Sequence, residues 1–321
     1  MLPPLSLIKA ELETVENWLR KELQSQHPFI NEVSHYIVFS GGKRIRPLLC
    51  VLCAKALNGV KDEVLYPTSI LFEYLHAATL LHDDVVDQAE FRRGRKAARN
   101  LWGNQATILV GDYLYAKSLK LASRLRNPEI MEVITHTTLL MSEGEVLQLI
   151  NLDNPALTEK EYKDVIYRKT AVLISACCEV GALLAEADLE TCKALKNFGT
   201  SIGMAFQIVD DLLDYLSTET GKDLGKDFKE GKITLPVIYA LEEAKENDRK
   251  RLLELFKIKN PDESHFMEAK DLIDKYKGFE KTKKKAEEYI FSAKKDLNCL
   301  KDSPYKSALN FITDYILERN K

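Results

Sequence analysis

Two aspartate triplets with the same spacing lie inside apolar segments that have a helical period. They are Asp83, Asp84 and Asp87, and, about 127 residues later, Asp210, Asp211 and Asp214. On a helix, the first and last aspartates of each triplet share one face and the middle one flanks them. Uncompensated carboxylates in apolar helices are costly. The chain is therefore expected to form helices that bring cations to both triplets.

The residue types around the triplets favour magnesium. Hard carboxylate oxygens, with little histidine and no thiolate nearby, suit Mg²⁺. This ion usually takes one or two carboxylates, keeps several waters and completes its shell with substrate phosphates. One triplet alone could equally be a helix cap or a solvated face. The pair, flanked by apolar residues on both sides, predicts that all six aspartates bind metal together with a phosphorylated substrate.

Composition agrees with a globular enzyme made of one domain. The 321 residues are 45% hydrophobic and 30% charged, with a formal net charge of −3. No Pro/Gly/Ser-rich linker divides the chain, so we expect a single all-helical domain over residues 1–321. No run of 18 apolar residues and no secretory signal is evident, which predicts a cytoplasmic protein. The six cysteines are expected to be buried or half-buried thiols.

The apolar pattern predicts an all-α fold. Three- and four-residue spacing of apolar positions marks helices over residues 2–23, 48–56, 65–82, 105–125, 130–150, 159–184, 189–216 and 235–244. No convincing set of paired strands is present. Breaks are expected at Pro28, Gly41-Gly42, Asn58-Gly59, Asn127-Pro128, Asn154-Pro155 and residues 221–231. The Lys/Glu-rich last eighty residues are interpreted as solvated helix faces, which argues against a nucleic-acid partner.

Several motifs, in order, resemble those of the trans-prenyl diphosphate synthases. Residues 72–87, followed by Arg92-Arg93-Gly94, resemble the first aspartate-rich motif of that family, and residues 207–214 resemble the second. Gly41–Pro47, Gly111–Leu114, Lys169-Thr170 and Gly231–Pro236 complete the series over most of the chain. The resemblance implies one large helical bundle of the isoprenoid synthase type with a central substrate cavity. It also implies up to three Mg²⁺ ions bound with diphosphate.

The same resemblance assigns basic and polar residues to two substrates. Isopentenyl diphosphate would be bound by Lys43, Arg46, His76 and Arg93. The allylic diphosphate would be bound by Arg92, Lys169, Thr170, Gln207, Lys222 and Lys232, with Lys169 also counted as catalytic and Lys226 in the same flap-like stretch. A multiply charged anion requires such cations. Taken alone, His76 could be a core histidine and Lys169 a salt-bridge partner.

The implied reaction is a head-to-tail prenyl transfer. The allylic diphosphate ionises to an allylic cation, and the double bond of isopentenyl diphosphate attacks it before a proton is lost. Stabilising the departing charge is the main catalytic requirement, and water must be excluded from the cation. The small residues Ala78 and Thr79 precede Asp83 by about one helical turn, where the growing tail would pass. In the family that the motifs resemble, aromatic residues at these positions stop growth at short products, so the resemblance implies a long product, octaprenyl diphosphate for a quinone side chain.

Partners and competing functions complete the expectations. The resemblance implies a homodimer, and the apolar product suggests transient membrane contact. Alternatives are a farnesyl or geranylgeranyl diphosphate synthase, a terpene cyclase of the same fold, and a non-catalytic synthase subunit. A carboxylate-bridged di-iron bundle, which uses Glu-x-x-His on two helices, is a further alternative because Glu32-x-x-His35 and Glu73-x-x-His76 both occur. It would leave the aspartate triplets unexplained.

Overall fold

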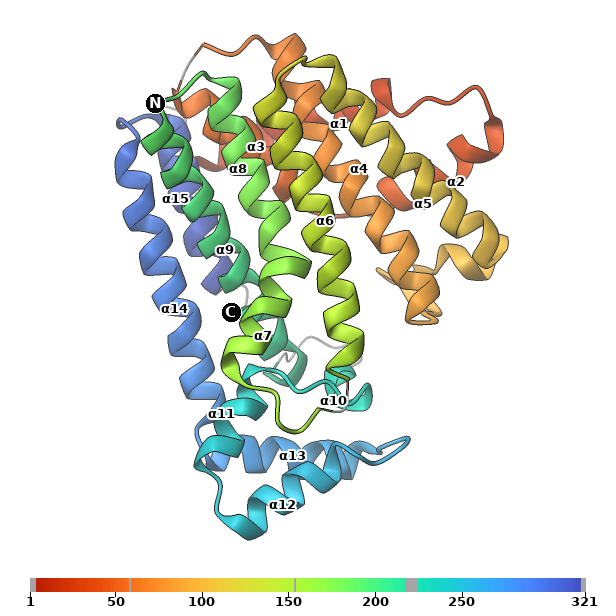
Figure 1. Cartoon of the computed structure of the whole chain (residues 1–321), viewed down its shortest axis with the longest axis vertical. Helices are drawn as coiled ribbons and strands as arrows, with labels where there is room; N and C mark the ends of the chain where they lie inside the picture. Colours follow the sequence, from red (N-terminus) through yellow and green to blue (C-terminus); the bar gives the residue numbers. More distant parts are fainter. Residues whose placement is uncertain (1–3, 58, 153, 217–224, 319–321) are drawn as a thin grey trace. The chain divides into compact units, whose positions relative to one another are not determined.

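The computed structural model describes residues 4–57, 59–152, 154–216 and 225–318, and these residues are almost entirely helical. The helices are α1 (Pro4–Glu22), α2 (Pro28–Val38), α3 (Ile45–Leu57), α4 (Asp62–Val86), α5 (Ala98–Arg124), α6 (Pro128–Ile150), α7 (Glu159–Ile166), α8 (Val172–Leu184), α9 (Leu189–Leu216), α10 (Lys226–Lys229), α11 (Leu235–Glu243), α12 (Glu246–Leu255), α13 (Glu263–Lys275), α14 (Gly278–Asp296) and α15 (Pro304–Glu318) (Figure 1). A π-helical segment, η1 (Tyr167–Ala171), joins α7 to α8, and a short 3₁₀ turn, η2 (Leu297–Cys299), follows α14. The all-α prediction is confirmed.

The chain divides into two compact units. The first comprises residues 1–136, 176–195 and 299–309, and the second comprises residues 137–175, 196–298 and 310–321. The first unit contains α1 to α5, and the second contains α7, η1 and α10 to α14, while α6, α8, α9 and α15 contribute to both. Each unit is considered by itself below. The single domain expected over residues 1–321 stays a prediction.

Helix α4 forms the centre of the first unit. Fourteen of its residues are buried, including Phe72, Tyr74 and Leu81, so apolar side chains cover nearly all of its circumference. Such a helix is stable only when neighbours surround it, and α3 and α5 pack along it (Figure 1). Gly111 on α5 permits this approach, because a Cβ atom there would lie 2.4 Å from Nε2 of His82 on α4. The motif glycine therefore has a packing role.

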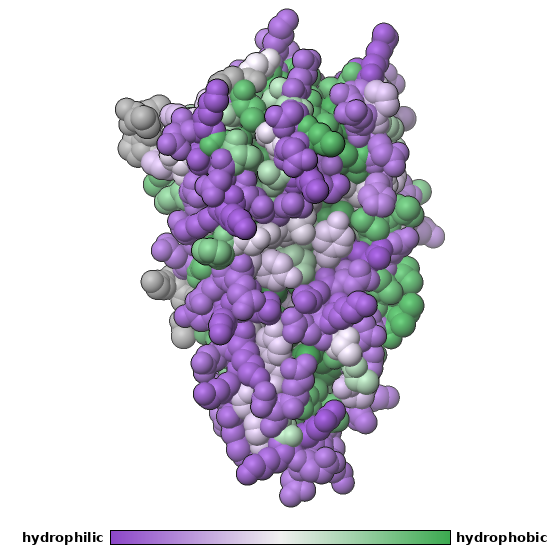
Figure 2. All heavy atoms as spheres, turned by 60° about the vertical axis from the view of Figure 1, so that its left-hand side comes forward, coloured by the Kyte–Doolittle hydropathy of each residue, from purple (hydrophilic) through white to green (hydrophobic). Residues whose placement is uncertain are grey.

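Helix α14, near the C-terminal end of the chain, is amphipathic. Helix α14 buries Phe279, Ala286, Ile290 and Ala293, while its Lys and Glu side chains face solvent. Figure 2 shows hydrophilic residues over most of one face of the molecule, with hydrophobic residues between them in separate groups. The expected solvated helix faces in the last eighty residues are therefore present.

The predicted helix bounds agree with the structure in most places. Helix α9 has the expected bounds, whereas α4 is longer at both ends. Helix α2 was not expected, because Pro28 was interpreted only as a break. Proline has no amide hydrogen and a fixed φ, so it also suits the first position of a helix. A two-residue hairpin, β1 (Phe91–Arg92) with β2 (Arg95–Lys96), was likewise missed.

Five cysteines are buried free thiols, as expected, but Cys299 is exposed, so the expectation was wrong there. As far as the described residues extend, no helix is both long and apolar enough to cross a membrane.

Candidate active site

The first aspartate triplet lies in the last turn of α4 and just beyond it. Asp83 is half-buried and Asp87, which follows the helix end, is exposed. The middle residue, Asp84, is fully buried and accepts a hydrogen bond of 2.5 Å from Nε of Arg92. Buried carboxylates require such pairing. The two outer carboxylates therefore reach solvent, whereas the middle one is held by the β1 strand.

Four arginines lie close enough to His76, seven residues before Asp83 on α4, to affect its charge. This arginine group consists of Arg44, Arg46, Arg92 and Arg93. Burial and then the positive charge of all four arginines hold the pKa of His76 well below its ordinary value. The imidazole is therefore neutral at neutral pH. Positive charge concentrated in this way would favour the binding of a multiply charged anion.

Only part of the arginine group is neutralised by protein carboxylates. Arg44 donates to Glu16 at 2.6 Å and to Glu73 at 2.7 Å. In contrast, the buried Nε of Arg46 has no hydrogen-bond partner among the described residues. Burial lowers the pKa of the Arg46 guanidinium, which Glu73 partly offsets. A charged group left in this state is expected to bind an external anion.

The Gly41-Gly42 turn lies against Arg44 and Arg93 of the arginine group. Both glycines have positive φ, 100° and 123°, which side-chain-bearing residues rarely adopt. The carbonyl oxygen of Gly41 accepts a hydrogen bond from Nη1 of Arg93 on the hairpin. Lys43, the next residue in the chain, is exposed. The predicted tight turn is present, and Arg46, His76 and Arg93 lie in one electrostatic cluster.

The neutral state of His76 predicts a pH-dependent stability. Its pKa is lowered on folding, so the unfolded chain binds a proton first as the pH falls below about 6.5. The contribution of His76 is complete above that pH and declines below it, by up to about 1.4 kcal/mol per pH unit. We expect His76→Gln to flatten this part of the curve. Denaturant unfolding of both proteins between pH 5 and 8 measures it, and parallel curves would contradict it.

The second triplet lies near the end of α9 and repeats the pattern of the first. Asp210 is exposed, Asp214 is half-buried, and the middle residue Asp211 is buried. The hydroxyl of Tyr162 donates to Oδ2 of Asp211 at 2.5 Å, and Nε2 of Gln207 donates to Oδ1 at 2.9 Å. Thr170 in turn donates to Oε1 of Gln207 at 2.8 Å. These contacts form an ordered chain behind the outer aspartates.

Burial and neighbouring carboxylates raise the pKa values of several aspartates at the second triplet. Burial raises the pKa of Asp211 well above its usual range, and that of Asp214 is raised as well. Burial and the neighbouring Asp214 also raise the pKa of Asp227, to about 7. The backbone N–H groups of Lys226 and Asp227 donate to the Asp214 carboxylate. Added positive charge would relieve this crowding.

The donor set agrees with magnesium bound together with a substrate. Among the described residues, no three His, Cys, Asp or Glu side chains are grouped closely enough to hold a metal ion by themselves. Mg²⁺ typically needs only one or two carboxylates when phosphate oxygens complete its shell. Crowded carboxylates with raised pKa values therefore suit this ion. The metal roles of the six aspartates stay predictions.

Lys169 and Thr170 lie in the π-helical segment η1. Such segments are rare and frequently occur at functional sites. Nζ of Lys169 donates to Glu145 on α6 at 2.7 Å, so it is both positioned and paired. Lys232 pairs with Glu230 at 2.5 Å, and Lys226 lies 3.4 Å from the same carboxylate. Lys222 lies outside the described residues.

Two residues with evident contacts at these positions were missed by the sequence analysis. Tyr162 holds Asp211, and Arg44 carries the ion pairs with Glu16 and Glu73. Tyr162 precedes Lys169 by seven residues, about two helical turns, which is the one signal that could have indicated it. Arg44 lies between two residues that were singled out. The sequence carries no signal for its pairing, because charge alone does not distinguish a paired arginine from an unpaired one.

The proposed length-determining residues lie in the middle of α4. Ala78 is buried, and Thr79 is half-buried and donates to the carbonyl oxygen of His76 at 2.8 Å. The role of Ala78 in setting product length stays a prediction.

The di-iron alternative gains no support from the described residues. Glu73 is bound by Arg44, and Nε2 of His35 is hydrogen-bonded to the carbonyl oxygen of Leu23. Both Glu-x-x-His motifs thus have other structural partners.

Comparisons with known proteins agree with the motifs and the fold. The sequence model of the family described as Polyprenyl synthetase matches residues 27–273. Octaprenyl diphosphate synthase of Escherichia coli (strain K12) is 35% identical and is covered over 98% of each chain. The short chain isoprenyl diphosphate synthase of Methanothermobacter thermautotrophicus is 33% identical over 99% of each chain. The crystal structure of a decaprenyl diphosphate synthase from Rhodobacter capsulatus superposes with a TM-score of 0.93 at 37% identity, covering 99% of this chain and 98% of that one.

The chain belongs to the polyprenyl synthetase family and has its all-α isoprenoid synthase fold. It is a prenyltransferase, a trans-prenyl diphosphate synthase.

Proposed function

We propose that this enzyme condenses an allylic diphosphate with successive isopentenyl diphosphate units to make a long all-trans chain, with octaprenyl diphosphate as the expected product. The observation that carries the assignment of substrates is the arginine group around the neutral His76, on the same helix as the first triplet. The arginine group supplies fixed positive charge, which could bind a diphosphate without a metal ion. A terpene cyclase, which uses one diphosphate, has no need of this second site.

We assign the polar residues to the two substrates by their places in the sequence motifs, and the contacts of Arg46, His76, Thr170 and Gln207 support this assignment. Arg46 and Arg93, with Lys43 and His76, bind isopentenyl diphosphate, and neutral His76 can donate a hydrogen bond without adding charge. Arg92, Lys169, Thr170, Gln207, Lys222 and Lys232 bind the allylic diphosphate. Asp83, Asp87, Asp210 and Asp214 would hold Mg²⁺, while Asp84 and Asp211 would complete each triplet from buried positions. Magnesium would supply the charge that stabilises the departing diphosphate.

Product length separates the proposed long-chain synthase from a short-chain synthase of the same family. Relatives of similar identity carry octaprenyl and short-chain names. The small side chains of Ala78 and Thr79 support the long-chain assignment, since a bulky residue one turn before the triplet would obstruct the tail. A ladder assay tests it: purified enzyme with Mg²⁺, farnesyl diphosphate and labelled isopentenyl diphosphate. A ladder that ends at three or four isoprene units would overturn long-chain synthesis, and cyclised product without incorporation would favour a terpene cyclase.

Replacing Ala78 with Phe should shorten the product without abolishing condensation. The larger side chain would project into the path of the tail. Chromatography of the dephosphorylated products measures the shift, with Ala78→Val as a matched smaller substitution that should shorten it less. An unchanged distribution in a folded Ala78→Phe enzyme would mean that the tail does not pass this position.

Tyr162→Phe should lower turnover by roughly 10-fold and raise the magnesium concentration required for half-maximal rate. Tyr162 is a positioning residue: it fixes Asp211, and losing one hydrogen bond to a charged group removes about 1.5–3 kcal/mol. Metal dependence distinguishes this role from a purely structural one. Tyr289→Phe, at a half-buried tyrosine of α14, is the matched control. An unchanged magnesium dependence for Tyr162→Phe would contradict the role.

A homodimer is proposed from the exposed apolar side of α5. On the part of α5 that follows the break at Gly103, Ile108 and Tyr115 lie seven residues apart and are 40% and 39% exposed, and Leu109 beside them is 66% exposed. Such a stripe is expected to pack against a partner. Sedimentation of the purified enzyme tests it, with Ile108→Glu expected to produce monomers. Cytoplasmic location and transient membrane contact for product release stay predictions.

A further inference from the structure

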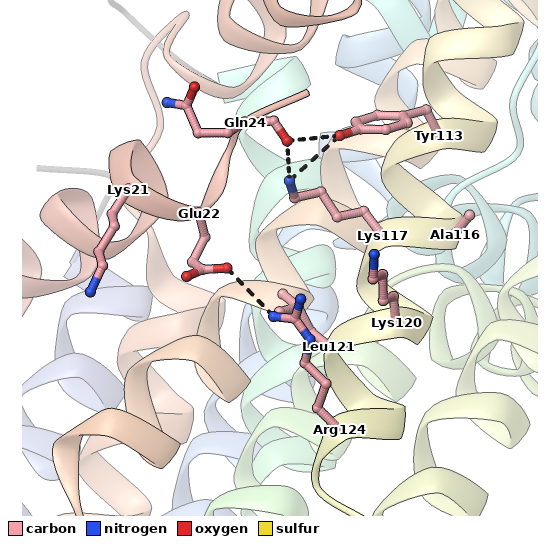
Figure 3. Close-up of a pocket in the computed structure, with 9 residues that line it drawn as sticks. All are labelled: Lys21, Glu22, Gln24, Tyr113, Ala116, Lys117, Lys120, Leu121 and Arg124. Atoms are coloured by element: carbon pink, nitrogen blue, oxygen red, sulfur yellow. Dashed lines mark hydrogen bonds and ion pairs between the residues drawn. The ribbon is translucent and has the colours of Figure 1, made fainter. Parts of the chain in front are cut away.

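A basic pocket lies in the first unit, and its lining residues are different from those of the arginine group. It has a volume of about 400 Å³ and forms where the end of α1 and the residues after it meet α5. Its walls include Glu22, Gln24, Tyr113, Lys117, Lys120 and Arg124 (Figure 3). None of these residues is used in the reaction proposed above.

Positive charge predominates along one side of this pocket. Lys117, Lys120 and Arg124 follow one another at three- and four-residue spacing, so their side chains share one face of α5. Glu22 is the one carboxylate among the lining residues, and it lies 3.8 Å from Arg124. Lys21 also lines the pocket, but its Nζ lies 4.2 Å from the ring centre of Trp18 and points away in Figure 3. Three neighbouring cations thus face one acid.

The wall of the pocket is already ordered. Nζ of Lys117 and the hydroxyl of Tyr113 both donate to the carbonyl oxygen of Gln24, at 2.9 and 3.1 Å. Figure 3 shows both interactions converging on that oxygen. A ligand would therefore meet a preformed surface.

We propose that this pocket binds a diphosphate group at a site separate from the substrate-binding residues. A diphosphate offers several acceptor oxygens and more than one negative charge, which matches three neighbouring cations. The source is either free inorganic diphosphate or the head group of a prenyl diphosphate. The proposal does not depend on the substrate roles assigned above.

Calorimetric titration of the full-length enzyme with inorganic diphosphate, without Mg²⁺, tests the proposal. We expect the double variant Lys120→Gln/Arg124→Gln to bind diphosphate at least 10-fold more weakly at one class of sites. Its prenyl transfer activity should be unchanged. The control Lys283→Gln/Lys284→Gln makes the same change of charge on α14 and should bind like the native enzyme.

The outcomes separate the possibilities. Equal numbers and affinities of sites in the native enzyme and in the pocket variant would overturn the proposal. Equal weakening in the α14 control would also overturn it, because the binding would then reflect net charge alone. Geranyl diphosphate titrated into the same proteins distinguishes the sources: equal binding to the pocket indicates the head group, and binding of inorganic diphosphate alone indicates the free anion.

Discussion

Asp210→Ala is expected to lower turnover by about 10²- to 10³-fold, the effect typical of removing one group that stabilises charge in a transition state. Asp210 is the exposed first residue of the second triplet, so its carboxylate is available to a metal bound with substrate. The change removes negative charge from a crowded group of carboxylates and should leave the helical fold intact. Steady-state kinetics at several magnesium concentrations, with circular dichroism, measure both effects.

Asp210 is a better probe than its neighbour. Asp211 is buried and bound by Tyr162 and Gln207, so its removal would leave two donors unpaired and mix a folding defect with a catalytic one. Asp271→Ala on the exposed side of α13 is the matched control and should be silent. Asp83→Ala should resemble Asp210→Ala. Near-native turnover in either triplet variant would refute the metal role of that triplet.

The placement of the candidate site residues on helices could be predicted from sequence, whereas their states of pairing could not. Spacing placed the triplets on helices because the helical period fixes which residues share a face. It did not separate Asp84 and Asp211, which are buried, from the outer aspartates, since that difference depends on Arg92 and Tyr162 reaching them from other elements. Long-range contacts of this kind have no local signature.

The fold shows the same division between local and tertiary information. Long apolar helices such as α9 were predicted with their bounds, because their periodicity is a local property. The β1–β2 hairpin was missed because four paired residues leave no periodic signal. Its position is nevertheless important: it holds Arg92 against Asp84 and Arg93 against the Gly41 carbonyl. A small element therefore organises much of the first unit's charge.

Arg46→Met is expected to raise KM for isopentenyl diphosphate by roughly 10- to 100-fold without lowering the free energy of unfolding. Loss of a charge-assisted hydrogen bond of about 1.5–3 kcal/mol accounts for the change in KM. Stability should be unchanged or raised by about 1 kcal/mol, because the buried Nε of Arg46 lacks a partner among the described residues and methionine fills similar space. Arg46 would therefore serve substrate binding and would not stabilise the folded protein.

Arg44→Met provides the contrasting control, two residues away in the same group. Arg44 pairs with both Glu16 and Glu73, so its removal breaks two ion pairs and should destabilise the protein by about 3 kcal/mol. Denaturant unfolding and steady-state kinetics of the two variants therefore give opposite patterns if the assignment is right. Equal losses of stability would indicate that Arg46 is a structural ion-pair residue like Arg44. An unchanged KM in a stable Arg46→Met enzyme would remove Arg46 from the isopentenyl diphosphate site.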